Sequence, residues 1–156
     1  MPVEVNEAIT PVVFWRKEFR LGSGGAGRQR GGLGQVIEIG GTDGLPFDVL
    51  AMFERCDNAP KGREGGKDGA KGRLSLASGA KLQPKGQQSI PPHDRLQLEL
   101  AGGAGFGNPY EREAELVAED VRNGLVSIAS AKTDYGVALA KDGSVDPSAT
   151  FKMRGI

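Results

Sequence analysis

The sequence predicts one α+β domain, in which a predominantly antiparallel β body over about residues 11–100 precedes two or three short helices. Short apolar runs bounded by glycine and proline recur through the first two thirds of the chain, which is typical of strands. After Pro109 the pattern changes to amphipathic segments with recognisable helix ends. A chain of 156 residues is long enough to bury one core and too short for two.

Five segments of the β body have the composition of strands. In residues 95–100, Leu96, Leu98 and Leu100 alternate with polar residues, so one face of this strand should pack on a core and the other should face water. The other four runs are rich in β-branched, aromatic or aliphatic residues and span residues 11–20, 36–39, 47–53 and 73–76.

The helical part carries its own end signals. Residues 111–123 place apolar side chains at helical spacing, begin with acidic residues and stop at Gly124. Ser127 is a suitable cap for a helix over 128–135 that Gly136 closes. The remaining expectations are a strand over 137–139, a turn at Asp142–Gly143, and a last helix capped by Asp146, with Pro147 in its first position, running toward Arg154.

These elements suggest a linear organisation. Residues 1–10 form an N-terminal extension or boundary segment, residues 11–107 the β body and residues 108–154 a helical tail. Residues 58–72 contain little besides glycine, lysine and other polar residues, and we expect a solvated, flexible loop there, with a mobile basic lip over an anionic site as the alternative.

Composition and charge exclude several classes of function. Twenty basic residues balance twenty acidic ones, so the chain lacks the excess positive charge of a general nucleic-acid or anionic-membrane binder. No apolar run has the length of a membrane span and the start lacks a signal-peptide pattern, so we expect a cytoplasmic protein. The single cysteine, Cys56, excludes an internal disulfide.

Twenty-five of the residues are glycine, and many of them gather in two segments, 22–34 and 102–107. Gly22, Gly24 and Gly27 fit the GxGxxG spacing of dinucleotide sites, but the residues that follow are a poor helix start, which that site requires. The sequence does not match the phosphate-binding P-loop motif either, because Asp68 stands where serine or threonine is needed after Gly66-Lys67. The glycines therefore indicate close backbone approach rather than a nucleotide site.

The first segment is the principal candidate site. Its backbone N–H groups and two arginines could hold a carboxylate or phosphate. Alternatively, it is a tight connection whose arginines pair with acids on the surface or across a subunit contact. The candidate residues are Ser23, Gly24, Gly25, Gly27, Arg28, Arg30 and Gly32. The second segment, with Gly103, Gly105, Phe106 and Gly107, is expected to be a bend that leads into the helical tail.

Two further residues are candidates for a catalytic role, and each also has a purely structural interpretation. His93 followed by Asp94 could be a general base with its orienting carboxylate, or a structural residue in a turn. Cys56 could be an activated thiol, or a small buried side chain. No catalytic residue is identified from these patterns.

Four motifs, in this order, resemble the C-terminal part of the hydantoinase B/5-oxoprolinase family. They are residues 23–34 (SGGAGRQRGGLG), 103–112 (GAGFGNPYER), 121–127 (VRNGLVS) and 135–137 (YGV). Two departures are visible: Gly22 and Asn108 each stand where the family usually has aspartate.

The resemblance implies ATP-dependent opening of cyclic amides, such as hydantoins or 5-oxoproline, or the related carboxylation of ketones. It implies that ATP is bound by a separate A-type subunit and that a metal is held upstream of this region of the B-type subunit. The chain itself would hold no cofactor, and would shape the site or the subunit interface rather than catalyse alone. The alternative is a non-enzymatic structural or docking module.

Overall fold

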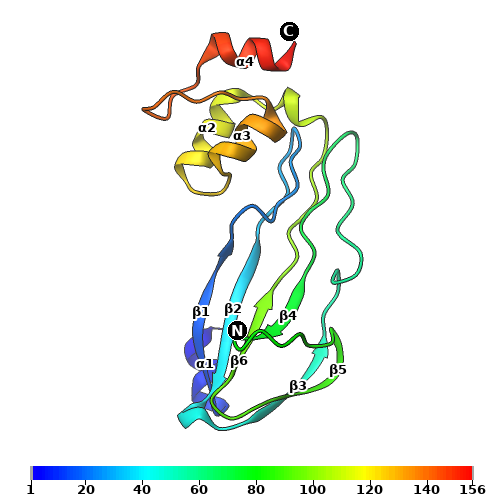
Figure 1. Cartoon of the computed structure of the whole chain (residues 1–156), viewed down its shortest axis with the longest axis vertical. Helices are drawn as coiled ribbons and strands as arrows, with labels where there is room; N and C mark the ends of the chain where they lie inside the picture. Colours follow the sequence, from blue (N-terminus) through cyan, green and yellow to red (C-terminus); the bar gives the residue numbers. More distant parts are fainter. Residues whose placement is uncertain (1, 156) are drawn as a thin grey trace. The chain divides into compact units, whose positions relative to one another are not determined.

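The computed structural model describes residues Pro2–Gly155, and its element order confirms the α+β prediction (Figure 1). The strands precede the three helices of the C-terminal part. They are β1 (Val12–Arg20), β2 (Gly34–Gly41), β3 (Phe47–Met52), β4 (Arg73–Leu76), β5 (Lys85–Ile90) and β6 (Arg95–Glu99). The helices are α1 (Val3–Ile9), α2 (Ala114–Arg122), α3 (Ile128–Tyr135) and α4 (Pro147–Arg154), with short 3-10 turns at Thr42–Gly44 and Pro109–Glu111.

The chain forms two compact units, each assembled from several stretches of sequence. Unit 1 contains the chain as far as Arg20, together with Gln35–Asn58 and Lys71–Ala101. Unit 2 contains Leu21–Gly34, Ala59–Ala70 and the chain from Gly102 onward.

Unit 1 is built on a four-stranded sheet in the order β1-β2-β6-β4. β6 is antiparallel to both of its neighbours, and its Leu98 lies opposite Ile37 of β2 and Leu74 of β4. Leu96 and Leu98 are buried, as the alternation in residues 95–100 predicts. The apolar side chains of one face therefore form a continuous core across the sheet.

A second, two-stranded sheet pairs β3 with β5 in antiparallel register. Ala51 of β3 and Ile90 of β5 are almost fully buried in the same core as the leucines of β6. β5 was not among the expected strands, because its sequence KGQQSI carries a single large apolar residue. Its conformation comes from pairing with β3.

Three glycine-rich segments lie side by side in unit 2 and form what we name the glycine mesh, residues 23–34, 59–70 and 102–107. Backbone hydrogen bonds join all three. Gly25 N–H donates to Gly103 O (2.8 Å), Lys67 N–H to Ala26 O (2.7 Å) and Gly105 N–H to Lys67 O (2.9 Å). Residues 102–107 lead from β6 toward the helices, as expected, and six of the twelve residues 59–70 are exposed, as expected of a solvated segment. Both segments are, in addition, hydrogen-bonded components of one structure.

Glycine is required in the mesh because the backbones touch. A Cβ atom on Gly31 would overlap the carbonyl oxygen of Gly103, and one on Gly66 would overlap that of Gly105. A Cβ on Gly25 would overlap the carbonyl oxygen of Lys67. Any side chain at these positions would push the segments apart and break the hydrogen bonds between them.

Helices α2 and α3 pack on the mesh through a small core in which Val117, Ala131, Tyr135 and Val137 surround Ala26. The end signals of α3 and α4 are confirmed, whereas the helix expected from residue 111 begins at Ala114, after a separate 3-10 turn. The Ser127 side chain accepts a hydrogen bond from Ser130 N–H, and Gly136 ends α3 in the left-handed conformation. Asp146 caps α4 in the same way. The strand expected over 137–139 is absent from the described chain, where Leu139 makes only an isolated bridge to Val145.

Candidate functional site

Arg28 is an exposed side chain of the first glycine segment. This side chain is about half exposed and lines an open depression of about 400 Å³ together with Phe106 and Gly107. Glu64 and Glu111 line the same depression, and the Glu111 carboxylate lies 3.9 Å from the Arg28 guanidinium. A cation beside two carboxylates suits a ligand or protein surface with both hydrogen-bond donors and acceptors better than it suits a lone anion.

Arg30, the second arginine of the segment, is engaged inside unit 2. Its Nε donates to Asp120 Oδ2 at 3.1 Å and its Nη2 approaches Oδ1 at 3.4 Å, which is the two-point geometry of an arginine–carboxylate pair. Arg112 Nη2 also donates to Asp120 Oδ2, at 2.9 Å. Because all three side chains are at least four-fifths buried, this cluster is a part of the structure of unit 2.

Asp120 and Arg112 are site-forming residues that sequence reasoning missed. Asp120 lies one turn after Val117 on α2, so it shares the buried face of that helix. The sequence signal for Asp120 was an aspartate on an otherwise apolar helix face. A carboxylate buried there needs a cationic partner, so its position could have indicated an ion pair. Its partner Arg30 lies ninety residues earlier in the chain, and no local pattern connects the two.

The other predicted site residues lie mainly within the mesh. Ser23 is buried, and its Oγ accepts a hydrogen bond from Gly34 N–H at 2.8 Å. Gly25, Gly27, Gly105 and Gly107 are also buried. Gly32, Gly103 and Phe106 are exposed, and Gly24 is intermediate. The close approach that the glycines predict is thus found between segments of this chain.

An ion pair ties the middle segment of the mesh to α3. Lys67 Nζ lies 2.7 Å from Asp134 Oδ1, and Ser130 Oγ donates to the other carboxylate oxygen. Burial raises the pKa of Asp134, but the hydrogen bonds from Lys67 and Ser130 outweigh it and hold the pKa below its ordinary value. The lysine of the segment that was expected to be solvated therefore has a structural partner.

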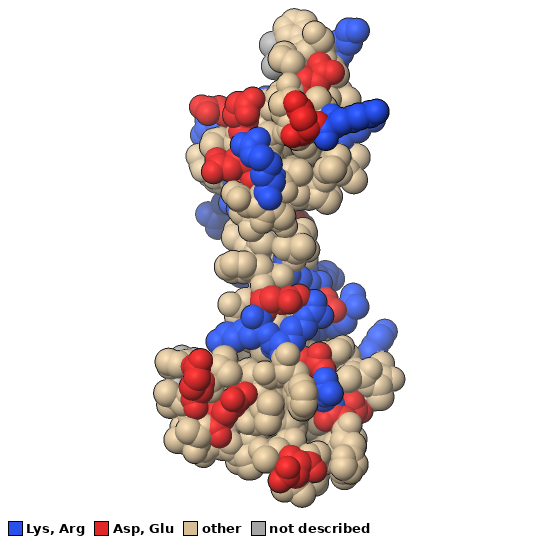
Figure 2. Space-filling view, turned by 90° about the vertical axis from the view of Figure 1, so that its left-hand side faces the viewer, with Lys and Arg blue, Asp and Glu red and all other residues tan. Residues whose placement is uncertain are grey.

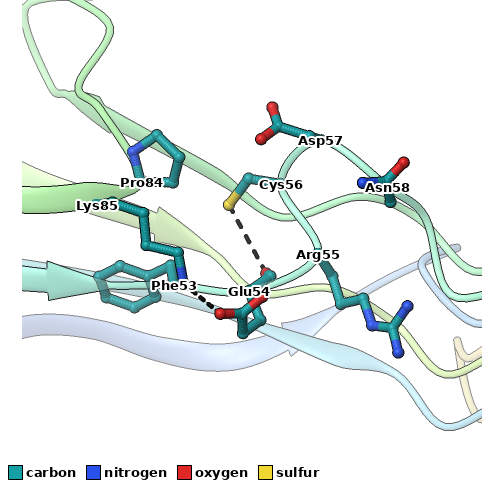
Figure 3. Close-up of a pocket in the computed structure, with 8 residues that line it drawn as sticks. All are labelled: Phe53, Glu54, Arg55, Cys56, Asp57, Asn58, Pro84 and Lys85. Carbon is teal, nitrogen blue, oxygen red and sulfur yellow. Dashed lines mark hydrogen bonds and ion pairs between the residues drawn. The ribbon is translucent and has the colours of Figure 1, made fainter.

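Cys56 lies in a small depression after β3, between Glu54, Asp57 and Pro84 (Figure 3). The Cys56 Sγ points to the carbonyl oxygen of Glu54 at 3.7 Å, and the neighbouring Lys85 ammonium pairs with the Glu54 carboxylate. Burial, followed by the charge of Asp57, raises the pKa of the Cys56 thiol. The thiol therefore stays protonated near neutral pH, which argues against the activated nucleophile.

His93 and Asp94 do not form the arrangement of a general base with its orienting carboxylate. The Asp94 carboxylate accepts hydrogen bonds from Ser78 Oγ at 2.6 Å and from Arg95 N–H at 2.8 Å. His93 has a positive φ of 61°, and its backbone N–H donates to the backbone oxygen of Gly44 at 2.9 Å. This geometry is that of a tight turn and supports a structural role for His93.

Two findings concern metals and membranes. Among residues Pro2–Gly155, no group of three or more His, Cys, Asp or Glu side chains is arranged to hold a metal ion. None of the helices in this range is long and apolar enough to span a membrane. Acidic and basic side chains mix over the upper part of the face drawn in Figure 2, and basic side chains gather in a band across its middle, although the charge of the whole chain is balanced.

Comparison with known proteins gives consistent matches. Residues 1–109 match the family described as hydantoinase B/oxoprolinase. A Pseudomonas protein described as the B component of a D-/L-hydantoinase is 30% identical over 99% of this chain and 27% of its own length. The crystal structure of the ATP-dependent caprolactamase from Pseudomonas jessenii has a TM-score of 0.80 and 30% identity, over 99% of this chain and 28% of that one.

A nucleotide-free structure of acetone carboxylase agrees in fold, with a TM-score of 0.78 at 24% identity over 99% of this chain and 26% of that chain. The chain thus spans about a quarter of the length of the relatives that it matches. The family match covers more than half of the chain. It contains the motif at residues 23–34 and most of the motif at 103–112, whereas the motifs at 121–127 and 135–137 lie beyond its end. The chain belongs to the hydantoinase B/oxoprolinase family.

Proposed function

We propose that this chain acts as the C-terminal domain of a B-type subunit in an ATP-dependent amidohydrolase whose substrates are cyclic amides, such as hydantoins or 5-oxoproline. The carrying observation is its 30% identity, over 99% of its length, to an enzyme described as an ATP-dependent caprolactamase, of which it covers 28%. Its role is to shape the active site or the subunit interface, and the chain does not catalyse alone.

In this proposal, ATP binds to a separate A-type subunit and a metal is held by an upstream part of the B-type polypeptide. One observation supports this division. The GxGxxG spacing at Gly22–Gly27 leads into the glycine mesh instead of a helix N-terminus, where a phosphate would bind.

The proposed partners are the A-type subunit and the upstream B-type region, within a cytoplasmic assembly that binds no nucleic acid. Two relatives support a role as one component of a larger enzyme, because they are described as the B component of a hydantoinase and the beta component of a caprolactamase. The balanced charge supports the exclusion of nucleic acid.

Arg28 is the mesh side chain best placed to contact substrate or partner, because it is half exposed while Arg30 is engaged with Asp120. We expect Arg28→Lys to lower turnover or assembly of the complete enzyme on the order of tenfold, because lysine cannot reproduce two-point pairing. Steady-state kinetics and size-exclusion chromatography measure the two effects. Lys152→Arg, on exposed α4, is the control. Unchanged turnover and assembly in Arg28→Lys would remove Arg28 from the site.

A chimera tests the proposed function. The matching quarter of the caprolactamase beta polypeptide is replaced by this chain, and the product is purified with its partner subunit. ATP-dependent release of ADP with caprolactam, hydantoin or 5-oxoproline supports the amidohydrolase role. A chimera that assembles without turnover supports the docking module instead. Turnover only with acetone and bicarbonate supports the carboxylase, the alternative that the fold of acetone carboxylase favours.

A further inference from the structure

Unit 1 contains an open groove whose charge differs from that of the chain as a whole. The groove has a volume of about 650 Å³, within the range of small-molecule sites. Four of its ten lining residues are Lys or Arg, and one is acidic. The complete chain carries 20 basic and 20 acidic residues, so the lining is a local concentration of positive charge.

The cations of the groove come from three neighbouring stretches. Arg20 ends β1, Arg73 begins β4, and Lys81 lies on the returning segment that pairs with Ser75 of β4. Lys71 precedes Arg73 by two residues. These positions converge because β4 and the segment after it run antiparallel, with Leu82 N–H donating to Leu74 O.

Glu99 neutralises only a part of this charge. It pairs with Arg20 at 2.7 Å and lies 3.8 Å from the exposed Arg73 guanidinium. Within Pro2–Gly155, Lys71 and Lys81 form no ion pair, and both are exposed. The remaining charges therefore face an open groove and can attract an anion from solvent.

The lining is not exclusively polar. Leu82 and Pro84 are partly exposed and supply apolar surface, whereas Leu74 is only 5% exposed and belongs to the core beneath the groove. Cys56 also lines the groove, and its thiol stays neutral, so it does not offset the cations. An apolar surface beside convergent cations fits a ligand that carries a charged head and an apolar part.

We propose that this groove binds a small organic anion, in which a phosphate or carboxylate lies against Lys71, Arg73 and Lys81 and an apolar portion contacts Leu82 and Pro84. The site goes beyond the proposed function, because it lies in unit 1 and uses no residue of the glycine mesh. Arg20 is held by Glu99 and by the carbonyl oxygens of Lys71 and Leu100, which keeps one cation in place before a ligand arrives.

The test is a titration of the 156-residue chain, followed by two-dimensional NMR of its backbone amides. Phenyl phosphate and benzoate are the probes that distinguish the two charged heads, and phenol is the neutral control. We expect saturable shifts at Lys71, Arg73 and Lys81, a Kd of about 1 mM for one of the anions, and weaker binding at high salt. Phenol should produce no saturable shift at these amides.

Variants separate a built site from general attraction. Lys71→Gln/Lys81→Gln should raise the Kd about fivefold, while Lys71→Arg/Lys81→Arg should retain binding. Lys17→Gln/Lys152→Gln removes two exposed lysines outside the groove and should leave the Kd unchanged. Absence of saturable shifts with both anions, or equal weakening by the two Gln pairs, would overturn the proposal. Because no mesh residue is altered, either result is independent of the amidohydrolase assay.

Discussion

At the scale of single residues, Asp120 is the most consequential side chain of unit 2. It is the one carboxylate in contact with the guanidinium groups of both Arg30 and Arg112 among the described residues. A buried ion pair does not itself guarantee stability, because desolvation opposes the attraction. Removing one partner is costly, however, since the remaining charges stay buried without compensation.

Asp120→Ala should therefore lower the free energy of unfolding by about 3–5 kcal/mol. Urea unfolding followed by circular dichroism measures the change. Glu119→Ala is a matched control on the adjacent, exposed position of α2 and should change stability by about 0.5 kcal/mol or less. Similar losses in the two variants would contradict the role assigned to the Arg30–Asp120–Arg112 cluster.

Ionisation of Asp134 makes the unfolding free energy of unit 2 depend on pH. Its folded-state pKa is depressed, so its contribution is complete above the unfolded-state value of about 3.9 and is lost as the pH falls through the folded-state value. We expect Asp134→Asn to be slightly less stable than the wild type at about pH 7, with the difference shrinking as the pH falls below the unfolded-state value. Urea unfolding at a series of acidic pH values measures this. A stability difference that persists in acid would exclude the ionised carboxylate as its cause.

At the scale of elements, local signals predicted local structure well. Ser127 and Gly136 were assigned as the ends of α3, and Asp146 and Pro147 as the start of α4, because these residues act on the backbone beside them. The strand at residues 95–100 was predicted equally well, since burial of one face imposes a two-residue period.

Elements defined by distant partners could not be predicted in the same way. The conformation of β5 depends on its pairing with β3, about forty residues away, and Gly86 within it has a positive φ of 89°. Residues 59–70 have the composition of a loop. Their hydrogen-bonding partners in the mesh lie in two other stretches of the chain, so no local pattern could reveal them. The candidate site had the same limitation: Arg28 and Arg30 looked equivalent in sequence, and only Asp120 distinguishes them.

Two adjacent glycines provide a direct test of the mesh. Gly31→Ala should destabilise the protein by about 3 kcal/mol, because its Cβ would overlap the Gly103 carbonyl oxygen. At Gly32 no atom lies within 4 Å of the position that a Cβ would occupy, so Gly32→Ala should be neutral or stabilising by up to about 1 kcal/mol. Thermal unfolding of the pair measures the difference. Equal melting temperatures would show that close backbone contact does not hold the mesh together.

At the scale of the whole molecule, the chain corresponds to about a quarter of the relatives that it matches. We expect the isolated 156-residue chain to show no ATP-dependent hydrolysis of 5-oxoproline or a hydantoin. The physical reason is that a phosphate-binding helix N-terminus is missing at the GxGxxG segment. A coupled assay of ADP release measures the activity. Reproducible, substrate-dependent ADP release from the isolated chain would contradict the proposed division of labour.

The three segments of the glycine mesh are separated by long intervals in the sequence, and this has a consequence for biosynthesis. The first segment is translated by residue 34, but Gly25 and Gly31 do not meet Gly103 until residues 102–107 have left the ribosome. Until then the backbone N–H and C=O groups of the first segment are hydrogen-bonded to water instead of to their partners in the mesh. Unit 2 can therefore complete its fold only after residue 107 is available, and we expect a chain truncated before that residue to leave the first segment exposed to proteases.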